Sequence, residues 1–158
     1  MTSMINYLFI FSAKYVYIAI IAIAVFYFLK QPSDIRKRII ILSVFVLPIT
    51  YAMAKLVGHF YYDPRPFVQN NFIPLIPHES NNGFPSNHTL VSAAISAVVY
   101  PFSRKTSIML WMMTALVGIS RVYVGVHHFI DVCSSIIISV VITWLIYKIV
   151  RLFRERLI

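Results

Sequence analysis

The stretch Ser120-Arg-Val-Tyr-Val-Gly-Val-His-His-Phe-Ile-Asp131 places an arginine, two histidines and a carboxylate between long apolar segments. Charged side chains at such depth are costly unless they pair or face water, so they mark functional sites. His127 and Asp131 are four residues apart and would share one face of a helix, where the carboxylate can hold one imidazole nitrogen. The other nitrogen is then free to attack, as in a catalytic triad. The stretch therefore predicts a catalytic histidine at position 127, and a purely structural role is the alternative.

The composition indicates a helical membrane protein. Of the 158 residues, 59% are hydrophobic and only 12% are charged, far from the balance of a soluble globular domain. The net charge of +9 does not indicate nucleic-acid binding, because ten of the fourteen lysines and arginines lie in three clusters at 30–38, 104–105 and 148–156. Such clusters are typical of cytoplasmic links, whereas a nucleic-acid site needs a contiguous basic face.

Five apolar segments are candidates for transmembrane helices, at about 5–29, 39–60, 88–102, 106–120 and 129–150. The third has only about 15 residues, too few to cross a hydrocarbon core ~30 Å thick at ~1.5 Å per residue. The sequence predicts an all-α fold, a single domain over residues 1–158 built as a polytopic membrane helical bundle of about five transmembrane helices. Residues 5–14 either complete the first span or lie in the interface.

Alternation of these spans assigns the loops to the two sides of the membrane. Every basic link then falls on the cytoplasmic side. The long loop 61–86 falls on the outer side, and so do the charged residues of the candidate site, which are Arg65, His88, Arg121, His127 and Asp131.

Arg65 is a second candidate for anion binding. It lies between Pro64 and Pro66, which restrict the local backbone, and its five N–H donors match the oxygens of a phosphate group. The alternative is an interfacial arginine that contacts lipid headgroups.

Ser86 and His88 form the third candidate. Ser86 precedes an apolar helical segment and suits the N-cap position, where its oxygen can accept a hydrogen bond from a free backbone N–H. A helix N-terminus is also an anion site, and His88 would face it from the first turn. The alternative is an ordinary capped helix with an interfacial histidine.

Metal binding is the competing chemistry. The chain has five histidines, but no H-E-x-x-H or H-x-H spacing occurs in it, so no set of ligands is indicated. We expect no catalytic metal.

Three motifs together resemble the signature of the type 2 phosphatidic acid phosphatase superfamily. They are Arg65-Pro66, then Pro85-Ser86-Asn87-His88, then Ser120-Arg121 followed after five residues by His127 and after three more by Asp131. The superfamily pattern is K-x6-R-P, P-S-G-H and S-R-x5-H-x3-D, and the third part matches at every specified position. The resemblance covers roughly residues 15–150 and implies an acid phosphatase/vanadium haloperoxidase-like core.

Two positions depart from the pattern. The family's lysine would fall at Gly58, and Lys55, about one helical turn earlier, is the candidate substitute. Asn87 replaces the glycine of P-S-G-H. Within the superfamily, the chain is most similar to the bacitracin-resistance type of undecaprenyl-diphosphate phosphatases, on the strength of Asp63-Pro-Arg-Pro-Phe67, Ile76-Pro-His78 and Phe84-Pro-Ser-Asn-His-Thr89.

The resemblance implies hydrolysis of a phosphoric ester or anhydride through a phosphohistidine, without metal or cofactor. His127 would attack phosphorus, Asp131 would hold its ring, and His88 would protonate the leaving oxygen and later activate water. His128 is the competing nucleophile, but the motif spacing favours His127. The implied phosphate-binding residues are Arg65, Arg121, Ser86, Asn87 and Lys55.

The implied substrate is a membrane lipid, and undecaprenyl diphosphate, converted to undecaprenyl phosphate, is the favoured one. Phosphatidylglycerophosphate, phosphatidic acid or another lipid monophosphate is the alternative, because the headgroup pocket is shared. A non-enzymatic membrane scaffold or transporter is a more remote alternative, and a soluble vanadium haloperoxidase does not fit a chain of apolar spans. The implied location is the plasma membrane, with the active site on the extracytoplasmic side.

Overall fold

The computed structural model describes residues 3–156, with side chains up to residue 153. Over this range the chain is all-helical apart from turns and one isolated β-bridge between Pro64 and Asn82. The helices are α1 (Met4–Leu29), α2 (Ser33–Phe60), α3 (Pro66–Gln69), α4 (Asn87–Val99), α5 (Arg104–Tyr123) and α6 (Phe129–Arg156). The prediction of an all-α bundle is confirmed.

Four of these helices, α1, α2, α5 and α6, are long and apolar enough to cross a membrane. The remaining long segment, α4, has 13 residues and is shorter still than the 15 expected, because the chain turns at residues 100–103 before α5 begins. The protein is thus a multi-pass membrane protein with four candidate spans, and α4 is the short helix among the five segments predicted.

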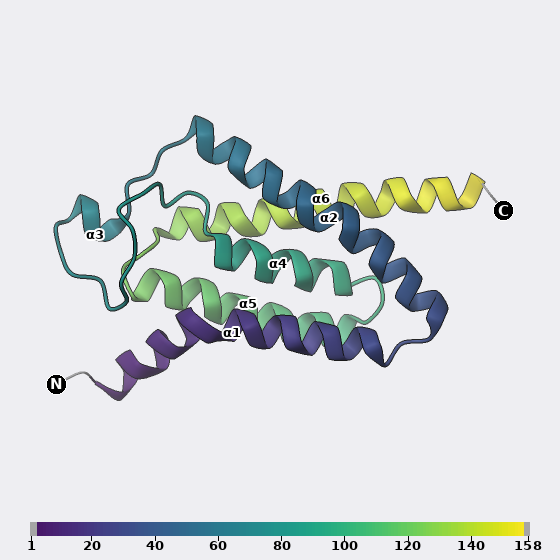
Figure 1. Cartoon of the computed structure of the whole chain (residues 1–158), viewed down its shortest axis with the longest axis horizontal. Coiled ribbons are helices and arrows are strands. Elements are labelled where there is room, and N and C mark those ends of the chain that lie inside the picture. The colour runs from purple at the N-terminus through teal and green to yellow at the C-terminus, as the bar shows by residue number, and fades with distance from the viewer. Residues whose placement is uncertain (1–2, 157–158) are drawn as a thin grey trace.

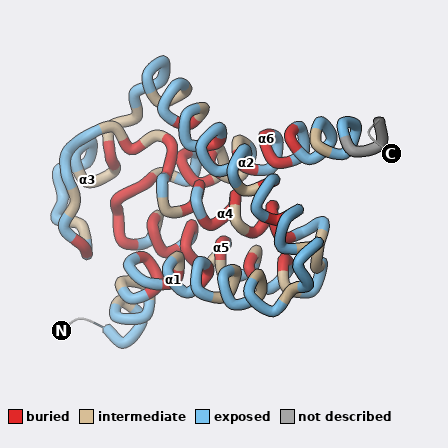
Figure 2. Tube along the Cα trace, turned by 45° about the vertical axis from the view of Figure 1, so that its right-hand side comes forward, coloured by how far each residue is buried: buried red, intermediate tan, exposed pale blue. Residues whose placement is uncertain are grey.

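Helix α4 lies at the centre of the bundle and packs against α1, α2, α5 and α6 (Figure 1). Most of its residues are buried, whereas α1 and α2 have many exposed residues (Figure 2). Large apolar side chains are among these exposed residues. Exposed apolar faces are expected where lipid is the solvent. The core helix therefore carries its N-terminus, and with it Ser86 and His88, into the interior of the protein.

Small polar side chains join α4 to its two closest partners. On α6, the hydroxyls of Ser135 and Ser139 donate to the backbone carbonyls of Ser86 and Leu90, at 2.9 and 3.0 Å. On α5, Ser107 donates to the carbonyl of Ser96 at 2.7 Å. Small residues allow helices to approach closely in a membrane, and their hydroxyls bond across the interface. These contacts fix the position of the start of α4 along the axis of α6.

Helix α1 continues without a break from Met4, so residues 5–14 extend the first helix. Phe9 stacks on Tyr123 at the end of α5, with ring centroids 4.1 Å apart, and the Tyr123 hydroxyl donates to Asn6 at 2.8 Å. This part of α1 therefore braces the end of α5 next to the turn at 124–128.

The link between α1 and α2 is shorter than expected. We predicted a polar link over 30–38, but α2 begins at Ser33, directly after Pro32, so its three basic residues at 36–38 lie on the first turns of the helix. Proline ends one helix and is tolerated at the start of the next. The α1–α2 link, the α4–α5 turn and the end of α6 all lie at one end of the bundle, opposite α3 and the long loop (Figure 1).

Candidate active site

The three motifs meet at the end of the bundle that carries α3 and the long loop (Figure 1). A cavity of about 420 Å³ opens there between the end of α2, the loop 61–86, the start of α4 and the turn before α6. It is lined by Ala54, Lys55, Gly58, His59, Arg65, His78, Asn81, Asn82, Phe84, Pro85, Asn87, His88, Arg121 and His127. Six of the eight predicted site residues therefore line one cavity, and Ser86 and Asp131 lie behind its wall.

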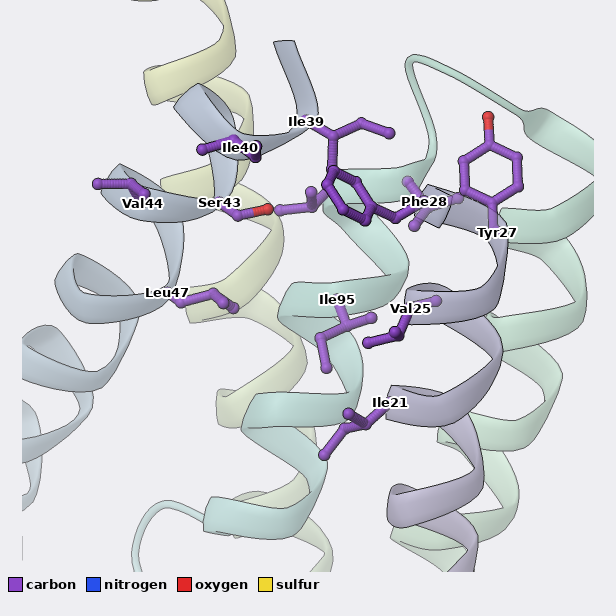
Figure 3. A pocket seen from close by; sticks show the side chains of 13 residues that line it. Ile21, Val25, Tyr27, Phe28, Ile39, Ile40, Ser43, Val44, Leu47 and Ile95 are labelled. Atoms are coloured by element: carbon purple, nitrogen blue, oxygen red, sulfur yellow. The ribbon is translucent and has the colours of Figure 1, made fainter. Parts of the chain in front are cut away.

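A second groove on the protein lacks the polar side chains that a catalytic site needs. It is an apolar groove of about 340 Å³ between α1, α2 and α4, and Tyr27 and Ser43 are the only polar residues in its lining (Figure 3). The helix turns that form it belong to the C-terminal part of α1 and the N-terminal part of α2, toward the basic end of the bundle. A groove lined mainly by aliphatic side chains can accommodate hydrocarbon chains. It contains no catalytic group.

His127 sits at the bottom of the cavity and is only 3% exposed. Its Nδ1 lies 3.1 Å from Oδ2 of Asp131. Its Nε2 lies 3.4 Å from Nη1 of Arg65 and 3.4 Å from Nη2 of Arg121. With the Nδ1 proton held by the carboxylate, the Nε2 lone pair points toward the place where the two guanidinium groups come together.

The pairing of His127 with Asp131 is present, but the expected reason for it is wrong. The two residues do not share a helix face, because α6 begins only at Phe129 and His127 lies in the preceding turn. Gly125 adopts φ +82° there, a conformation that other residues rarely take. The turn brings His127 back over the first turn of α6, where Asp131 lies.

Burial is the main cause of a His127 pKa well below the usual value, and the positive charges of Arg121 and Arg65 lower it further. A lowered pKa means that the imidazole stays neutral at neutral pH. Only the neutral ring has a lone pair on Nε2, so the site favours the nucleophilic form.

Arg65 is held in place by the loop and by the turn. Its Nε and Nη2 donate to Oδ1 of Asn81 at 3.0 and 2.8 Å, and its Nη1 donates to the carbonyl of Val126 at 2.8 Å. It is only 5% exposed. An arginine fixed on several sides has little conformational entropy left to lose when an anion binds.

Arg121, in the last turn of α5, is 3% exposed. Its Nε is buried and has no hydrogen-bond partner within the described residues. A buried guanidinium N–H without a partner is costly, and a bound phosphate oxygen would supply the missing acceptor.

The start of α4 is arranged differently from our prediction. Ser86 is the N-cap residue, but its side chain accepts no backbone N–H; instead its oxygen accepts a hydrogen bond from the Thr89 hydroxyl at 3.1 Å. The first backbone N–H groups of α4 therefore lack a side-chain cap and are available to an anion. Asn87 and His88 line the cavity at this point, and the His88 ring packs edge-on against Tyr17 at 4.6 Å.

Lys55 lines the cavity but is exposed, and its Nζ lies 5.4 Å from the centre of the Tyr51 ring. Gly58, where the family's lysine would fall, cannot carry a side chain without a backbone shift. A Cβ atom there would lie 2.8 Å from the carbonyl oxygen of Phe84. The close approach of α2 to the loop thus accounts for the glycine.

The structure adds residues that sequence reasoning missed. Asn81 orients Arg65, as described above. Asn82 binds the backbone of Asp63, Phe84, Gly58 and Tyr61 through its amide group and so joins the loop to the end of α2. His78, predicted only as part of the motif Ile76-Pro-His78, also lines the cavity, and its ring centroid lies 6.2 Å from that of His127. Asparagines are common in any loop, so the sequence contains no signal for these roles.

His128, the competing nucleophile, faces away from the cavity. Its ring nitrogen Nδ1 lies 3.0 Å from Oδ2 of Asp63, and it is not part of the cavity lining. Together with Asp131, these two residues offer three potential ligand atoms within 4.8 Å of one another.

Comparison with known proteins places this site in a family. The model of the PAP2 superfamily matches residues 38–155. The chain belongs to the PAP2 superfamily. It is 31% identical to undecaprenyl-diphosphatase BcrC of Bacillus subtilis over 96% of this chain and 78% of that protein. It is also 34% identical to phosphatidylglycerophosphatase B of B. subtilis, over 50% of this chain and 44% of that protein.

Solved structures agree on the fold. The crystal structure of LpxE from Aquifex aeolicus matches with a TM-score of 0.71 at 20% identity, over 94% of this chain and 88% of that chain. A PAP2-type phosphatidylglycerolphosphate phosphatase from B. subtilis matches with a TM-score of 0.56 at 23% identity, over 96% and 84% of the two chains. Family membership and these relatives make the chain a membrane-bound phosphatase.

Proposed function

We propose that the chain is a single integral-membrane phosphatase domain that hydrolyses undecaprenyl diphosphate to undecaprenyl phosphate and inorganic phosphate. The main support for this reaction is the geometry around His127. Two buried guanidinium groups, of Arg65 and Arg121, lie next to its Nε2, and Asp131 holds its Nδ1. The similarity to undecaprenyl-diphosphatase BcrC over nearly the whole chain supports the substrate.

In the first step, Nε2 of His127 attacks the terminal phosphorus, and the bond from that phosphorus to the bridging oxygen breaks. The proton on Nδ1 stays hydrogen-bonded to Asp131, which stabilises the ring as it becomes positively charged. His88, which takes up a proton when the negatively charged diphosphate binds, transfers that proton to the leaving oxygen. The products of this step are undecaprenyl phosphate and a phosphohistidine.

In the second step, His88 takes a proton from water, and the resulting hydroxide attacks the phosphohistidine, which releases phosphate and restores Nε2. Charge on the transferring oxygens is stabilised by Arg65 and Arg121 and by the free N–H groups at Asn87 and His88. Ser86 holds the N-cap position that presents those groups, and Lys55 contacts the lipid-linked phosphate from the cavity wall. These residues carry the positive charge that a metal would otherwise provide, so the reaction needs no metal.

The test is phosphate release by the detergent-purified protein from undecaprenyl diphosphate and from phosphatidylglycerophosphate, side by side and with EDTA. We expect preference for the diphosphate, no effect of EDTA, and loss of release in the His127→Ala variant. Preference for the glycerophospholipid would keep the mechanism and replace the substrate. That outcome is the second candidate function, which the similarity to phosphatidylglycerophosphatase B favours. Absence of activity on both lipids would point to phosphatidic acid or another lipid monophosphate as the substrate, and the scaffold or transporter alternative would follow only if these too were not hydrolysed.

We also propose that the protein lies in the plasma membrane with the cavity on the extracytoplasmic side. The basic links lie at the opposite end of the bundle from α3 and the long loop (Figure 1), and this loop borders the cavity. Basic links remain in the cytoplasm. In this orientation the cavity faces the outer leaflet.

Cysteine labelling tests this orientation. In a Cys133→Ala background, Ser80→Cys in the exposed loop should react with a membrane-impermeant maleimide in intact cells. The matched variant Ser33→Cys, exposed at the start of α2, should react only after permeabilisation. The reverse pattern of labelling would place the cavity in the cytoplasm.

A further inference from the structure

A second histidine–carboxylate pair lies directly behind the nucleophile. Nδ1 of His128 and Oδ2 of Asp63 are 3.0 Å apart, and the two side chains are 28% and 13% exposed. Neither residue lines the cavity, and the mechanism above uses neither. Removing such a pair from water costs desolvation free energy. A function served by this pair would account for that cost.

The pair is connected to His127 through one oxygen atom. The backbone N–H of His128 donates to Oδ2 of Asp131 at 2.8 Å, and the same oxygen lies 3.1 Å from Nδ1 of His127. The direction in which Asp131 holds the nucleophile therefore depends on where the backbone of His128 lies. The His128 side chain fixes that backbone by its contact with Asp63.

Asp63 is itself fixed by the loop that carries the phosphate-binding arginine. Its backbone N–H donates to Oδ1 of Asn82 at 3.0 Å, and its carbonyl accepts from the N–H of Gly83 at 2.8 Å. Arg65 follows two residues later. The contact between Asp63 and His128 thus couples the loop that binds phosphate to the turn that carries the nucleophile.

We infer that Asp63 and His128 are positioning residues that set the orientation and tautomer of His127 through Oδ2 of Asp131. This inference rests on the proposed function for its kinetic consequences, but not for its structural ones. Burial and the nearby Asp131 raise the pKa of the Asp63 carboxyl, so the contact with His128 is sensitive to the charge of its surroundings.

A bound cation is the rival explanation for this cluster, because Asp63, His128 and Asp131 could act together as metal ligands. The hydrogen bonds favour the positioning role. Asp63 and His128 already satisfy each other, and Oδ2 of Asp131 already accepts from the His128 backbone. A cation bound through these same atoms would have to break the contacts. Oδ1 of Asp131 is buried and has no hydrogen-bond partner within the described residues, so the EDTA measurement below tests whether a cation binds there.

The test uses Asp63→Asn, which keeps the size and an oxygen acceptor but removes the charge, and His128→Asn, which removes the ring. Asp34→Asn, at the exposed start of α2, is the matched control. We expect kcat to fall roughly 10–100-fold in both variants, the range found when the outer hydrogen-bond partner of a metal-binding histidine is removed, because each variant removes an indirect support of the His127 ring. KM should change less than about twofold, because neither side chain touches substrate.

Nitrogen-15 NMR of histidine-labelled protein supplies a readout that needs no substrate. The wild type and Asp34→Asn should show His127 as the single Nδ1–H tautomer, assigned with a His127→Asn sample. Asp63→Asn and His128→Asn should show a mixture of tautomers, with unchanged melting temperature. If the proposed lipid substrate is wrong, this spectral difference should still be present.

Three results would overturn the inference. The first is a kcat and a His127 spectrum in Asp63→Asn that equal those of the control. The second is a change in KM alone. The third is that EDTA abolishes both the activity of the wild-type protein and the NMR signal of the single His127 tautomer, and that zinc restores both. This result would establish a metal site. If Asp63→Asn does not fold, His128→Asn and Asp63→Glu decide the question by the same measurements.

Discussion

Replacing His127 with alanine should lower kcat on the lipid substrate by a factor of ~10⁴ or more, as is typical when the nucleophile of a covalent mechanism is removed. Among the described residues, Nε2 of His127 is the imidazole nitrogen that lies within 3.4 Å of both guanidinium groups. The ring centroid of His78, which also lines the cavity, lies 6.2 Å from that of His127, so we expect no other histidine to replace it efficiently. His128, the nearest histidine in the chain, is turned toward Asp63. Steady-state phosphate release from detergent-solubilised protein measures the effect.

Trapping the intermediate distinguishes a nucleophile from a merely essential residue. Substrate labelled with ³²P in the terminal phosphate should transfer its label to the wild-type protein in a rapid quench at alkaline pH, where phosphohistidine survives. The label should be absent from His127→Ala and present in His128→Ala. Label that persisted in His127→Ala and vanished in His128→Ala would make His128 the nucleophile.

The helices could be predicted from the sequence because each apolar segment must form its backbone hydrogen bonds internally in a membrane. Their ends were less predictable. Helix α2 begins at Ser33 and not at Ile39, because hydropathy does not distinguish a polar link from the polar first turns of a helix. Helix α1 includes residues 5–14 and is capped locally by Ser3. The contacts that this part of α1 makes with Tyr123 could not be predicted from the local sequence.

The site was predictable to the extent that its residues are recognised by their own chemistry and spacing. Arginine and histidine are rare at membrane depth, so Arg65, Arg121 and His127 were visible in the sequence. The groups that hold them were not visible, because Asn81 acts on Arg65 across sixteen positions of the chain and is an ordinary loop residue in isolation.

Local rules also led to two errors of detail. Ser86 is the N-cap residue of α4 as predicted, but its oxygen accepts from the Thr89 hydroxyl and not from a backbone N–H. A spacing of four residues suggested a helix face for His127 and Asp131, but a turn that closes onto the next helix produces the same contact. The contact was predictable from the spacing, whereas the backbone that makes it was not.

Arg65→Lys and Arg121→Lys should each lower kcat/KM by roughly 10²–10³-fold, the range found when one preorganised donor to a developing negative charge is removed. Lysine keeps the positive charge, so a loss in these variants measures the geometry of the donors and not the net charge. Nη1 of Arg65 contacts Val126 and His127, while its Nε and Nη2 donate to Asn81. A single ammonium group cannot make contacts in both directions.

Arg104→Lys is the matched control, because Arg104 is exposed at the start of α5 at the other end of the bundle, and it should retain wild-type kinetics. The division of the loss between kcat and KM is informative. Donors that act on the transferring phosphoryl group should lower kcat, because charge on its oxygens must be stabilised most in the transition state. A rise in KM alone in Arg65→Lys and Arg121→Lys would instead show that the arginines only hold the substrate, and the transition-state role of the two converging guanidinium groups would have to be abandoned.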